Sequence, residues 1–501
     1  MKKLAVIAIC LASLYREADA QDARTVVATA QKALGNPQSI TYSGSAKDVA
    51  FQQCGANAAD MMCRGTHDPM RPIGSYVRVI DLTAPVSRHA GGTNNIGPGG
   101  STTVTPGTFF QQVTPQQADV SQPWAGSAEF YITPWGFLNG AAANNPTASR
   151  RRVDRRNYTV LSWSPAVTAP SGRKYVINGY VNESNLIERV ETWLGENLMG
   201  DMHILARYTG WKDFGGVMAP SKIVQTRGGW PFFEVDVTAA RANPADLATI
   251  APAPASASGR GGPGSGTPPA GGAAPAVTVT SERLGDGLYR LTTGPGSYDS
   301  VVVEFPDHIM MLEAGQSEAR ALAYMAEAKK LIPNKPIRYV MNTHPHSDHT
   351  GGLPALVAEG ATIITQRNNE QFLARALNTP RTLLNDTLAK NPKKARIEAV
   401  SEKKVYSDGT RTVEMYHVEP VPHSNGLMVA YIPKEKILFQ GDFSLPANGQ
   451  PANDHVLALA PVLDRLKLDF DRYINVHASA TPQAKVDFAK AVEIRRKSAP
   501  K

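Results

Sequence analysis

The pattern of apolar and polar residues changes along the chain, and its first half predicts strands. Between about Tyr158 and Val237, five short runs alternate apolar and polar positions, and Gly, Pro, Asn or Asp bounds each run. These runs are residues 174–182, 186–194, 202–211, 221–227 and 232–237. A period of two indicates strands with one buried face, so their succession predicts an antiparallel meander. A helix is predicted upstream of them, over residues 23–34.

Downstream of residue 277, short apolar runs alternate with helical periodicity. Strands are predicted at residues 288–292, 300–305, 308–313, 337–341, 361–365, 412–418, 427–431, 436–439 and 473–476. Helices are predicted at residues 318–331, 353–359, 368–377 and 482–496. Strand pairs followed by strand–helix alternation predict an α/β sandwich. The whole chain is therefore expected to be of the α+β class, with a mainly antiparallel β domain first.

A low-complexity segment separates the two patterns. Residues 251–276 consist almost entirely of Ala, Pro, Gly and Ser, with Arg260 as the single charge. Such a segment cannot bury apolar surface, so a flexible linker is predicted. A chain of 501 residues is also too long for one ordinary core. We therefore expect a domain over residues 21–250 and a second domain over residues 277–501.

The first 20 residues resemble an export signal. Lys2-Lys3 precedes an apolar stretch over residues 4–14, and Ala18-Asp19-Ala20 provides a small-x-small cleavage site before Gln21. The apolar stretch is too short to span a bilayer, and no other stretch is long enough. We expect a soluble protein that is periplasmic or secreted.

Two features of composition refine this prediction. In an oxidising compartment, Cys54 and Cys63 would be expected to form a disulfide, because nearby residues do not complete a structural zinc pattern. The formal net charge is +8, but the densest basic runs are only Arg150-Arg151-Arg152 and Arg495-Arg496-Lys497. Such short runs are usually solvated surface, so we expect a small-molecule substrate and no nucleic-acid partner.

One short segment carries the clearest chemistry. Residues 343–352 read Thr-His-Pro-His-Ser-Asp-His-Thr-Gly-Gly, although the whole chain has only 11 histidines. The segment follows a predicted buried strand, so His344, His346, Asp348 and His349 can leave the strand end together. Imidazole and carboxylate groups suit zinc, manganese or iron. The two glycines are expected to give the tight turn before the next helix.

Three later residues repeat this placement. His423, Asp442 and His477 each lie just past the end of a predicted strand. Loops at strand ends are where a rigid sheet presents catalytic groups. Seven polar groups crowded together without metal would be costly to bury. The sequence therefore predicts a metal centre.

The His-x-His-x-Asp-His run and its three later partners resemble those of the metallo-β-lactamase-fold superfamily, over roughly residues 277–501. The resemblance implies a four-layer αβ/βα sandwich with the site at one edge. It also implies two metal sites: His344, His346 and His423 at the first, Asp348, His349 and His477 at the second, and Asp442 bridging them.

The resemblance and the ligand chemistry together predict a hydrolase. Two divalent ions, with zinc expected first and manganese or iron as alternatives, would share a water and lower its pKa towards neutrality. The bridging hydroxide would attack a lactone, ester or amide carbonyl, and Asp348 would orient it or carry a proton, as in the family. β-Lactamases of the superfamily usually carry Cys or Ser where Asp442 stands, which disfavours a β-lactam substrate.

Several alternatives stay open at this point. β-Lactamase or phosphodiesterase activity could use the same site, while the 24 residues after His477 are too few for the helical region of glyoxalase II. An iron-dependent oxidase would use the same ligand types. The N-terminal strands weakly resemble the half-open barrels that carry lipids or lipoproteins, so the protein could chiefly bind an apolar ligand. Of the remaining histidines, His455 is expected at the surface, and His417 and His308 are expected to be packed.

Overall fold

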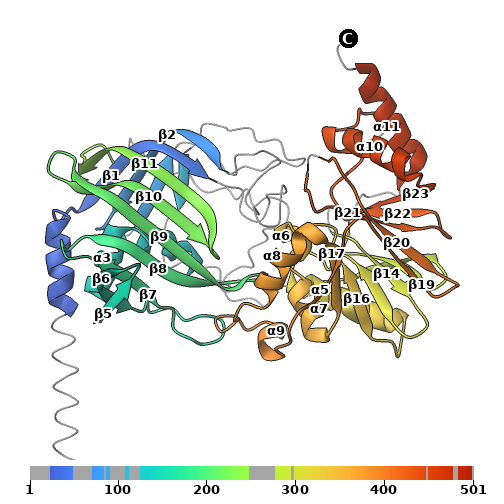
Figure 1. Ribbon diagram of the computed structural model, residues 1–501, viewed down its shortest axis with the longest axis horizontal. Coiled ribbons are helices and arrows are strands. Elements are labelled where there is room, and N and C mark those ends of the chain that lie inside the picture. The colour runs from blue at the N-terminus through green and yellow to red at the C-terminus, as the bar shows by residue number, and fades with distance from the viewer. Residues whose placement is uncertain are drawn as a thin grey trace, which may run out of the picture.

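Three β-sheets organise the chain in the computed structural model (Figure 1). The structure describes residues 23–48, 70–83, 86–90, 108–111, 124–247, 277–294, 298–421, 423–446, 449–477 and 483–498. The predicted export signal, the predicted Cys54–Cys63 disulfide and the predicted linker over residues 251–276 lie outside these residues, and these predictions stay untested.

The first sheet has eleven strands in the order β4-β3-β2-β1-β11-β10-β9-β8-β7-β6-β5. The pairings within it are antiparallel, which confirms the predicted meander and extends it in both directions. Its strands are β1 (Ser39–Asp48), β2 (Arg71–Asp81), β3 (Val86–Ala90), β4 (Thr108–Gln111), β5 (Thr147–Val153), β6 (Arg156–Trp163), β7 (Ile177–Val181), β8 (Ile187–Glu196), β9 (Gly200–Asp213), β10 (Met218–Arg227) and β11 (Trp230–Ala242). The predicted N-terminal helix occupies residues 23–33.

Two helices that the sequence pattern did not predict pack against this sheet: α2 (Ala125–Tyr131) and α3 (Pro134–Ala143). Thr133 caps α3 by accepting a hydrogen bond from the Gly136 amide, and Pro134 opens the helix. Gly179 on β7 leaves room for the ring of Phe137, because a Cβ atom there would collide with that ring. Buried aromatic side chains from both helices therefore fill the space next to the sheet.

The second half contains two further sheets. One has seven strands, β12 (Thr280–Gly285), β13 (Leu288–Thr292), β14 (Ser300–Glu304), β15 (Ile309–Leu312), β16 (Ile337–Met341), β17 (Thr362–Gln366) and β18 (Arg396–Val400). The other has six, β19 (Lys403–Ser407), β20 (Thr412–His417), β21 (Met428–Ile432), β22 (Ile437–Gln440), β23 (Arg472–Asn475) and β24 (Gln483–Ala484). The helices are α5 (Glu318–Leu331), α6 (Ser347–Thr350), α7 (Leu353–Glu359), α8 (Arg367–Leu377), α9 (Thr387–Lys390), α10 (Asp454–Leu466) and α11 (Lys485–Ser498).

These elements form four layers. An apolar core that includes Val301, Met310, Met415 and Phe439 lies between the two sheets. Helices α5 and α7 pack on the outer face of the seven-stranded sheet, and α10 and α11 pack on the outer face of the six-stranded sheet. The predicted α+β class and the αβ/βα sandwich are therefore confirmed. Helix α10 was not predicted, because Pro461 lies inside it and its first turn is polar.

The two halves of the chain contact each other through the segment that follows α8. The Asp201 carboxylate, at the start of β9, accepts hydrogen bonds from the backbone amides of Thr382 and Leu383 at 2.8 and 2.9 Å. The buried Arg381 guanidinium donates to the backbone carbonyls of Asn197 and Leu198. Such charge-assisted bonds hold the β8–β9 connection against the second half.

Among the described residues, no helix is both long and apolar enough to span a membrane.

Candidate metal centre

The seven sequence-predicted side chains meet where strands of the two inner sheets end. His344 follows β16 by three residues, Asp442 follows β22 by two, and His477 follows β23 by two. Strands β22 and β23 run parallel, so their carboxyl ends lie at one edge of the sheet. The structure brings all seven residues together, in two neighbouring groups.

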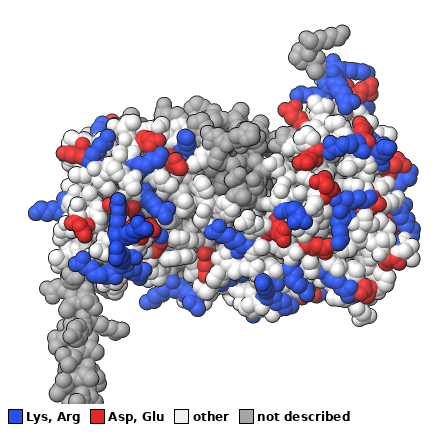
Figure 2. Space-filling model, in the orientation of Figure 1, with Lys and Arg blue, Asp and Glu red and all other residues white. Residues whose placement is uncertain are grey.

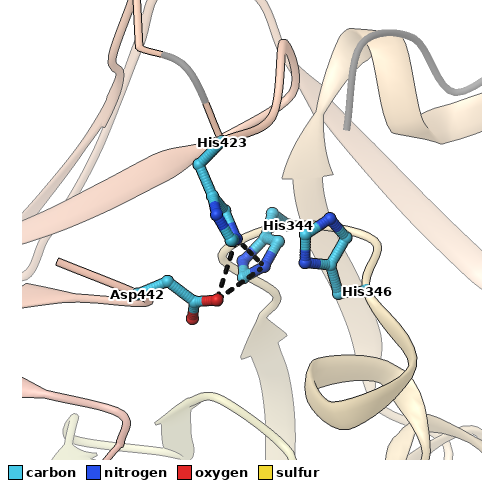
Figure 3. A group of neighbouring side chains, drawn as sticks. All are labelled: His344, His346, His423 and Asp442. Atoms are coloured by element: carbon cyan, nitrogen blue, oxygen red, sulfur yellow. Dashed lines mark hydrogen bonds and ion pairs between the residues drawn. The ribbon is translucent and has the colours of Figure 1, made fainter. Parts of the chain in front are cut away.

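The first group comprises His344, His346, His423 and Asp442, whose candidate ligand atoms lie within 4.8 Å of one another. Figure 3 shows the three imidazole rings and the carboxylate converging on one point. The Nε2 atoms of His344 and His423 are 3.1 Å apart. His344 and His346 are buried, so their side chains lie in a low-dielectric environment.

The second group comprises Asp348, His349 and His477. Asp348 Oδ2 lies 3.5 Å from His349 Nε2 and 3.7 Å from His477 Nε2. His349 is fully buried, whereas the His477 side chain is 32% exposed. This group therefore has an open side that solvent can reach.

Asp442 lies between the two groups and directs one oxygen at each. Its Oδ2 is 2.8 Å from His423 Nε2 in the first group. Its Oδ1 is 2.8 Å from His349 Nε2 and 2.9 Å from His477 Nε2 in the second. A carboxylate in this position can bind a cation with each oxygen.

The pKa values of the histidines shift in opposite directions in the two groups. Burial lowers the pKa of His344 and His346 well below the ordinary value, so both are neutral with a lone pair available. Burial alone would also lower the pKa of His349, but the carboxylates of Asp442 and Asp348 outweigh it and raise that pKa. The surrounding imidazoles outweigh the burial of Asp442 and hold its pKa well below the usual range.

Glu313 supports the second group, and sequence reasoning missed it. It follows β15, is fully buried, and places Oε2 2.6 Å from His349 Nδ1. Its Oε1 accepts a hydrogen bond from the Thr343 amide at 2.6 Å. A carboxylate on the far nitrogen orients an imidazole ligand and raises its basicity. The available signal was an acidic residue directly after an apolar strand.

Tyr298 is a second residue that the sequence did not single out. Its hydroxyl donates to Asp348 Oδ2 at 3.1 Å, and its ring lies 4.7 Å from that of His477. Burial and the Asp348 carboxylate raise the pKa of the Tyr298 phenol, so it stays protonated at neutral pH. Its sequence context, after a Gly-Pro-Gly-Ser run, gave no sign of this role.

Two glycines let the His-x-His-x-Asp-His segment approach its neighbours. A Cβ atom at Gly351 would collide with the carbonyl oxygen of Gln316, and one at Gly352 would collide with that of Ala314. Both glycines have negative φ angles. The predicted requirement for glycine therefore stands, but its reason is close backbone approach.

The remaining histidines take different positions. The expected surface position of His455 is wrong: the residue is buried in the first turn of α10, and its ring lies 5.1 Å from that of His423. His417 is packed, as predicted, and its Nε2 lies 2.8 Å from the Asn425 carbonyl oxygen. His308 is also packed, stacked on Phe305.

The donor set fits divalent metal ions. Both ring nitrogens of His346 are buried and have no hydrogen-bond partner in the described part of the chain. An unsatisfied buried nitrogen costs free energy, and coordination of a cation would remove that cost. Imidazole and carboxylate ligands without thiolate suit zinc, manganese and iron.

A protein-family model matches the region of the chain that contains this site. Residues 293–477 match the family model described as "Metallo-beta-lactamase superfamily". A metallo-beta-lactamase from Pontibacter korlensis is 15% identical, with a TM-score of 0.34, over 44% of this chain and 100% of that chain. One from Hirschia baltica is 20% identical, with a TM-score of 0.33, over 43% and 97%. The metallo-beta-lactamase FIM-1 from Pseudomonas aeruginosa, in a mono-zinc form, is 18% identical, with a TM-score of 0.33, over 44% and 96%. The region matched by the family model contains all seven side chains of the two groups.

Proposed function

We propose, from the match of residues 293–477 to the metallo-beta-lactamase superfamily model, that the protein is an exported hydrolase that would hold two divalent metal ions and cleave a lactone, ester or amide carbonyl. The observation that carries the proposal is the position of Asp442. Its two oxygens lie 2.8 Å from His423 and 2.8 Å from His349, which belong to different histidine groups. A carboxylate in this position could act as a ligand to two metal ions at once.

The two groups divide the ligands between the ions. His344, His346 and His423 would hold one ion, and Asp348, His349 and His477 the other, while Asp442 would contact both. Bound divalent ions would supply Lewis acidity that polarises a carbonyl oxygen and lowers the pKa of water. Zinc is the first candidate for the ligand set, with manganese or iron as alternatives.

The side chains of the chain itself position and move protons. The pKa of Asp348 is lowered, because its histidine neighbours outweigh its burial, so the carboxylate is ionised at neutral pH. Asp348 would orient the attacking water and accept its proton, and the Tyr298 hydroxyl would hold Oδ2 in place. Glu313 would fix the ring of His349 through Nδ1.

The bridging carboxylate supports a lactone, ester or amide substrate over a β-lactam. Asp442 occupies the position where β-lactamases of the superfamily usually carry Cys or Ser. β-Lactam or phosphodiester cleavage is the alternative, because the same groups could act on either bond. Export is supported by the sequence of residues 1–20, with its basic start, apolar stretch and Ala-Asp-Ala site.

A substrate panel with matched variants tests the proposal. The full chain, supplied with zinc or manganese, is assayed on lactone, ester, amide, β-lactam and phosphodiester substrates. Turnover of one carbonyl class, lost in Asp348→Ala and His423→Ala but retained in His308→Gln, is expected. His308 is a suitable control because it is a packed histidine beside a carboxylate, Asp307, outside both groups.

Each other outcome has a definite meaning. Turnover that survives in both Asp348→Ala and His423→Ala would contradict the mechanism. Redox activity with bound iron, without hydrolysis, would favour an oxidase. No turnover of any class would favour a ligand-binding protein that carries an inactive metal domain.

A further inference from the structure

The hairpin of β5 and β6 carries an unusual concentration of positive charge. Arg150, Arg151 and Arg152 are consecutive on β5, Arg155 lies in the turn, and Arg156 starts β6. All five side chains are exposed. Asp154 is the one acidic residue of this segment, so residues 147–163 have a net charge of +4. This is half of the net charge of +8 of the whole chain. We call this element the basic hairpin.

Neighbouring carboxylates leave most of this charge uncompensated. Arg156 forms an ion pair with Glu188 at 3.2 Å. Within the residues that the structure describes, Arg150, Arg151, Arg152 and Arg155 form no ion pair. A cluster of unpaired guanidinium groups repels itself, so an anionic partner would lower its electrostatic energy.

The basic hairpin lies at the edge of the eleven-stranded sheet, where β5 is the last strand. Consecutive strand residues point to opposite faces, so the three arginines of β5 spread around the edge instead of lining a groove. Figure 2 shows basic side chains gathered at the lower left, over β5 and β6. The metal centre lies in the other half of the molecule, so a partner at this edge would leave it accessible (Figure 1).

The loop that follows β6, at the end of that strand away from the hairpin turn, adds two cations. Arg173 and Lys174, between β6 and β7, are also exposed. Val176 follows directly and is 40% exposed, one of few large apolar side chains with such exposure. Exposed cations beside an exposed apolar residue suit the interface between lipid headgroups and acyl chains.

We propose that the basic hairpin binds the anionic phospholipid headgroups of a membrane surface. Guanidinium groups match the geometry of phosphate oxygens and bind them with two hydrogen bonds. A broad, convex set of cations fits a surface of many headgroups. The aromatic residues of the hairpin, Tyr158 and Trp163, are buried, so the hairpin offers no stacking platform for single-stranded nucleic acid.

Vesicle binding tests the proposal. The chain from Gln21 onward is used, because the apolar stretch at residues 4–14 would bind lipid by itself. It is incubated with phosphatidylcholine vesicles that contain or lack phosphatidylglycerol, and the bound fraction is measured by sedimentation. Each basic residue near an anionic surface contributes about fivefold in affinity, so R150Q/R151Q/R152Q should bind roughly 100-fold more weakly than the wild type.

The C-terminal basic run supplies a matched control. R495Q/R496Q/K497Q removes the same formal charge from α11, where Arg496 and Lys497 are exposed and Arg495 is half-buried. Arg495 and Lys497 form ion pairs with Asp454 and Glu493, so this run carries less uncompensated charge than the basic hairpin. This variant should retain most of the binding, and hydrolysis of a soluble substrate should be unchanged in both triple variants. Wild-type binding should also weaken steeply with added salt. This salt titration tests the proposal even if a triple variant fails to fold.

Four outcomes would overturn the proposal. Equal losses in the two triple variants would mean that net charge alone matters. Wild-type binding that does not weaken with salt would exclude an electrostatic attachment. Retained binding in R150Q/R151Q/R152Q would mean that these arginines do not bind lipid. Their role would then be to prevent the edge strand from pairing with other chains. Binding to a duplex oligonucleotide but not to vesicles would identify a nucleic-acid surface instead.

Discussion

The role of Glu313 gives a prediction that separates orientation of a ligand from ligation itself. Glu313→Gln keeps the volume of the side chain and one acceptor oxygen for the Thr343 amide. The other terminal atom becomes an NH₂ group that faces His349 Nδ1, now 2.6 Å from Glu313 Oε2. Nδ1 must then accept a hydrogen bond, so the proton moves to Nε2. That is the nitrogen that faces Asp442 and would bind the metal.

The expected loss follows from this change of tautomer. Removal of an orienting partner behind an imidazole ligand usually costs about 10–100-fold in metal affinity. The loss should fall on one ion only, because His344, His346 and His423 do not contact Glu313. Competition with a chromophoric chelator would resolve two binding steps, of which one weakens in Glu313→Gln and the other stays within about twofold.

A control distinguishes this effect from a general loss of charge. Glu304→Gln removes a carboxylate on β14, in the same sheet as β15. Glu304 pairs with Lys335 at 2.8 Å and lies away from the metal centre. The two binding steps of this variant should match those of the wild type. Unchanged affinities in Glu313→Gln would refute the argument that the carboxylate sets the tautomer of His349.

Three further predictions concern other contacts. Tyr298→Phe should lower kcat by roughly tenfold with little change in KM, because a hydrogen bond to a charged group such as Asp348 contributes about 1.5 kcal/mol or more. Steady-state kinetics measure both constants, and an unchanged kcat would show that the contact has no role in turnover. Gly351→Ala should destabilise the protein by about 1–3 kcal/mol through backbone collision, measured by denaturant unfolding, and an unaltered midpoint would argue against close approach there. The pKa of Glu191 is lowered to about 2, because hydrogen bonds from His203 and other neighbours outweigh burial. The ionised Glu191 therefore stabilises the fold above its ordinary pKa, and this stabilisation is lost as the pH falls towards 2. Glu191→Gln should lower the free energy of unfolding by about 1–2 kcal/mol at pH 7, allowing for solvent screening, and by progressively less at lower pH. A loss of stability that does not depend on pH would contradict this assignment.

The convergence of the seven side chains could be predicted from the sequence, because it depends on short local patterns of residues. Most candidates lie just past an apolar run. The adjacent parallel strands β22 and β23 carry Asp442 and His477 to one edge of the six-stranded sheet, while His344 follows β16 of the seven-stranded sheet. His344, His346, Asp348 and His349 are in addition fixed relative to one another by a single short segment. The order of the sheets did not need to be known for that inference.

Other features depend on tertiary contacts that no local pattern reports. Glu313 and Tyr298 acquire their roles from residues 36 and 50 positions away, His349 and Asp348. His455 looked like a loop residue because Asn453 and Asp454 are polar, yet Asn453 caps α10 by accepting a hydrogen bond from the Val456 amide. Helices α2 and α3 were missed because small residues interrupt their apolar pattern, and packing against the sheet decides their structure.

The most direct test of the central claim is an anomalous diffraction measurement on crystals of the full chain grown with zinc. Two anomalous peaks are expected, one on the Oδ2 side of Asp442 beside His423 and one on the Oδ1 side beside His349 and His477. A single peak, or none under saturating zinc, would contradict a two-metal centre bridged by Asp442.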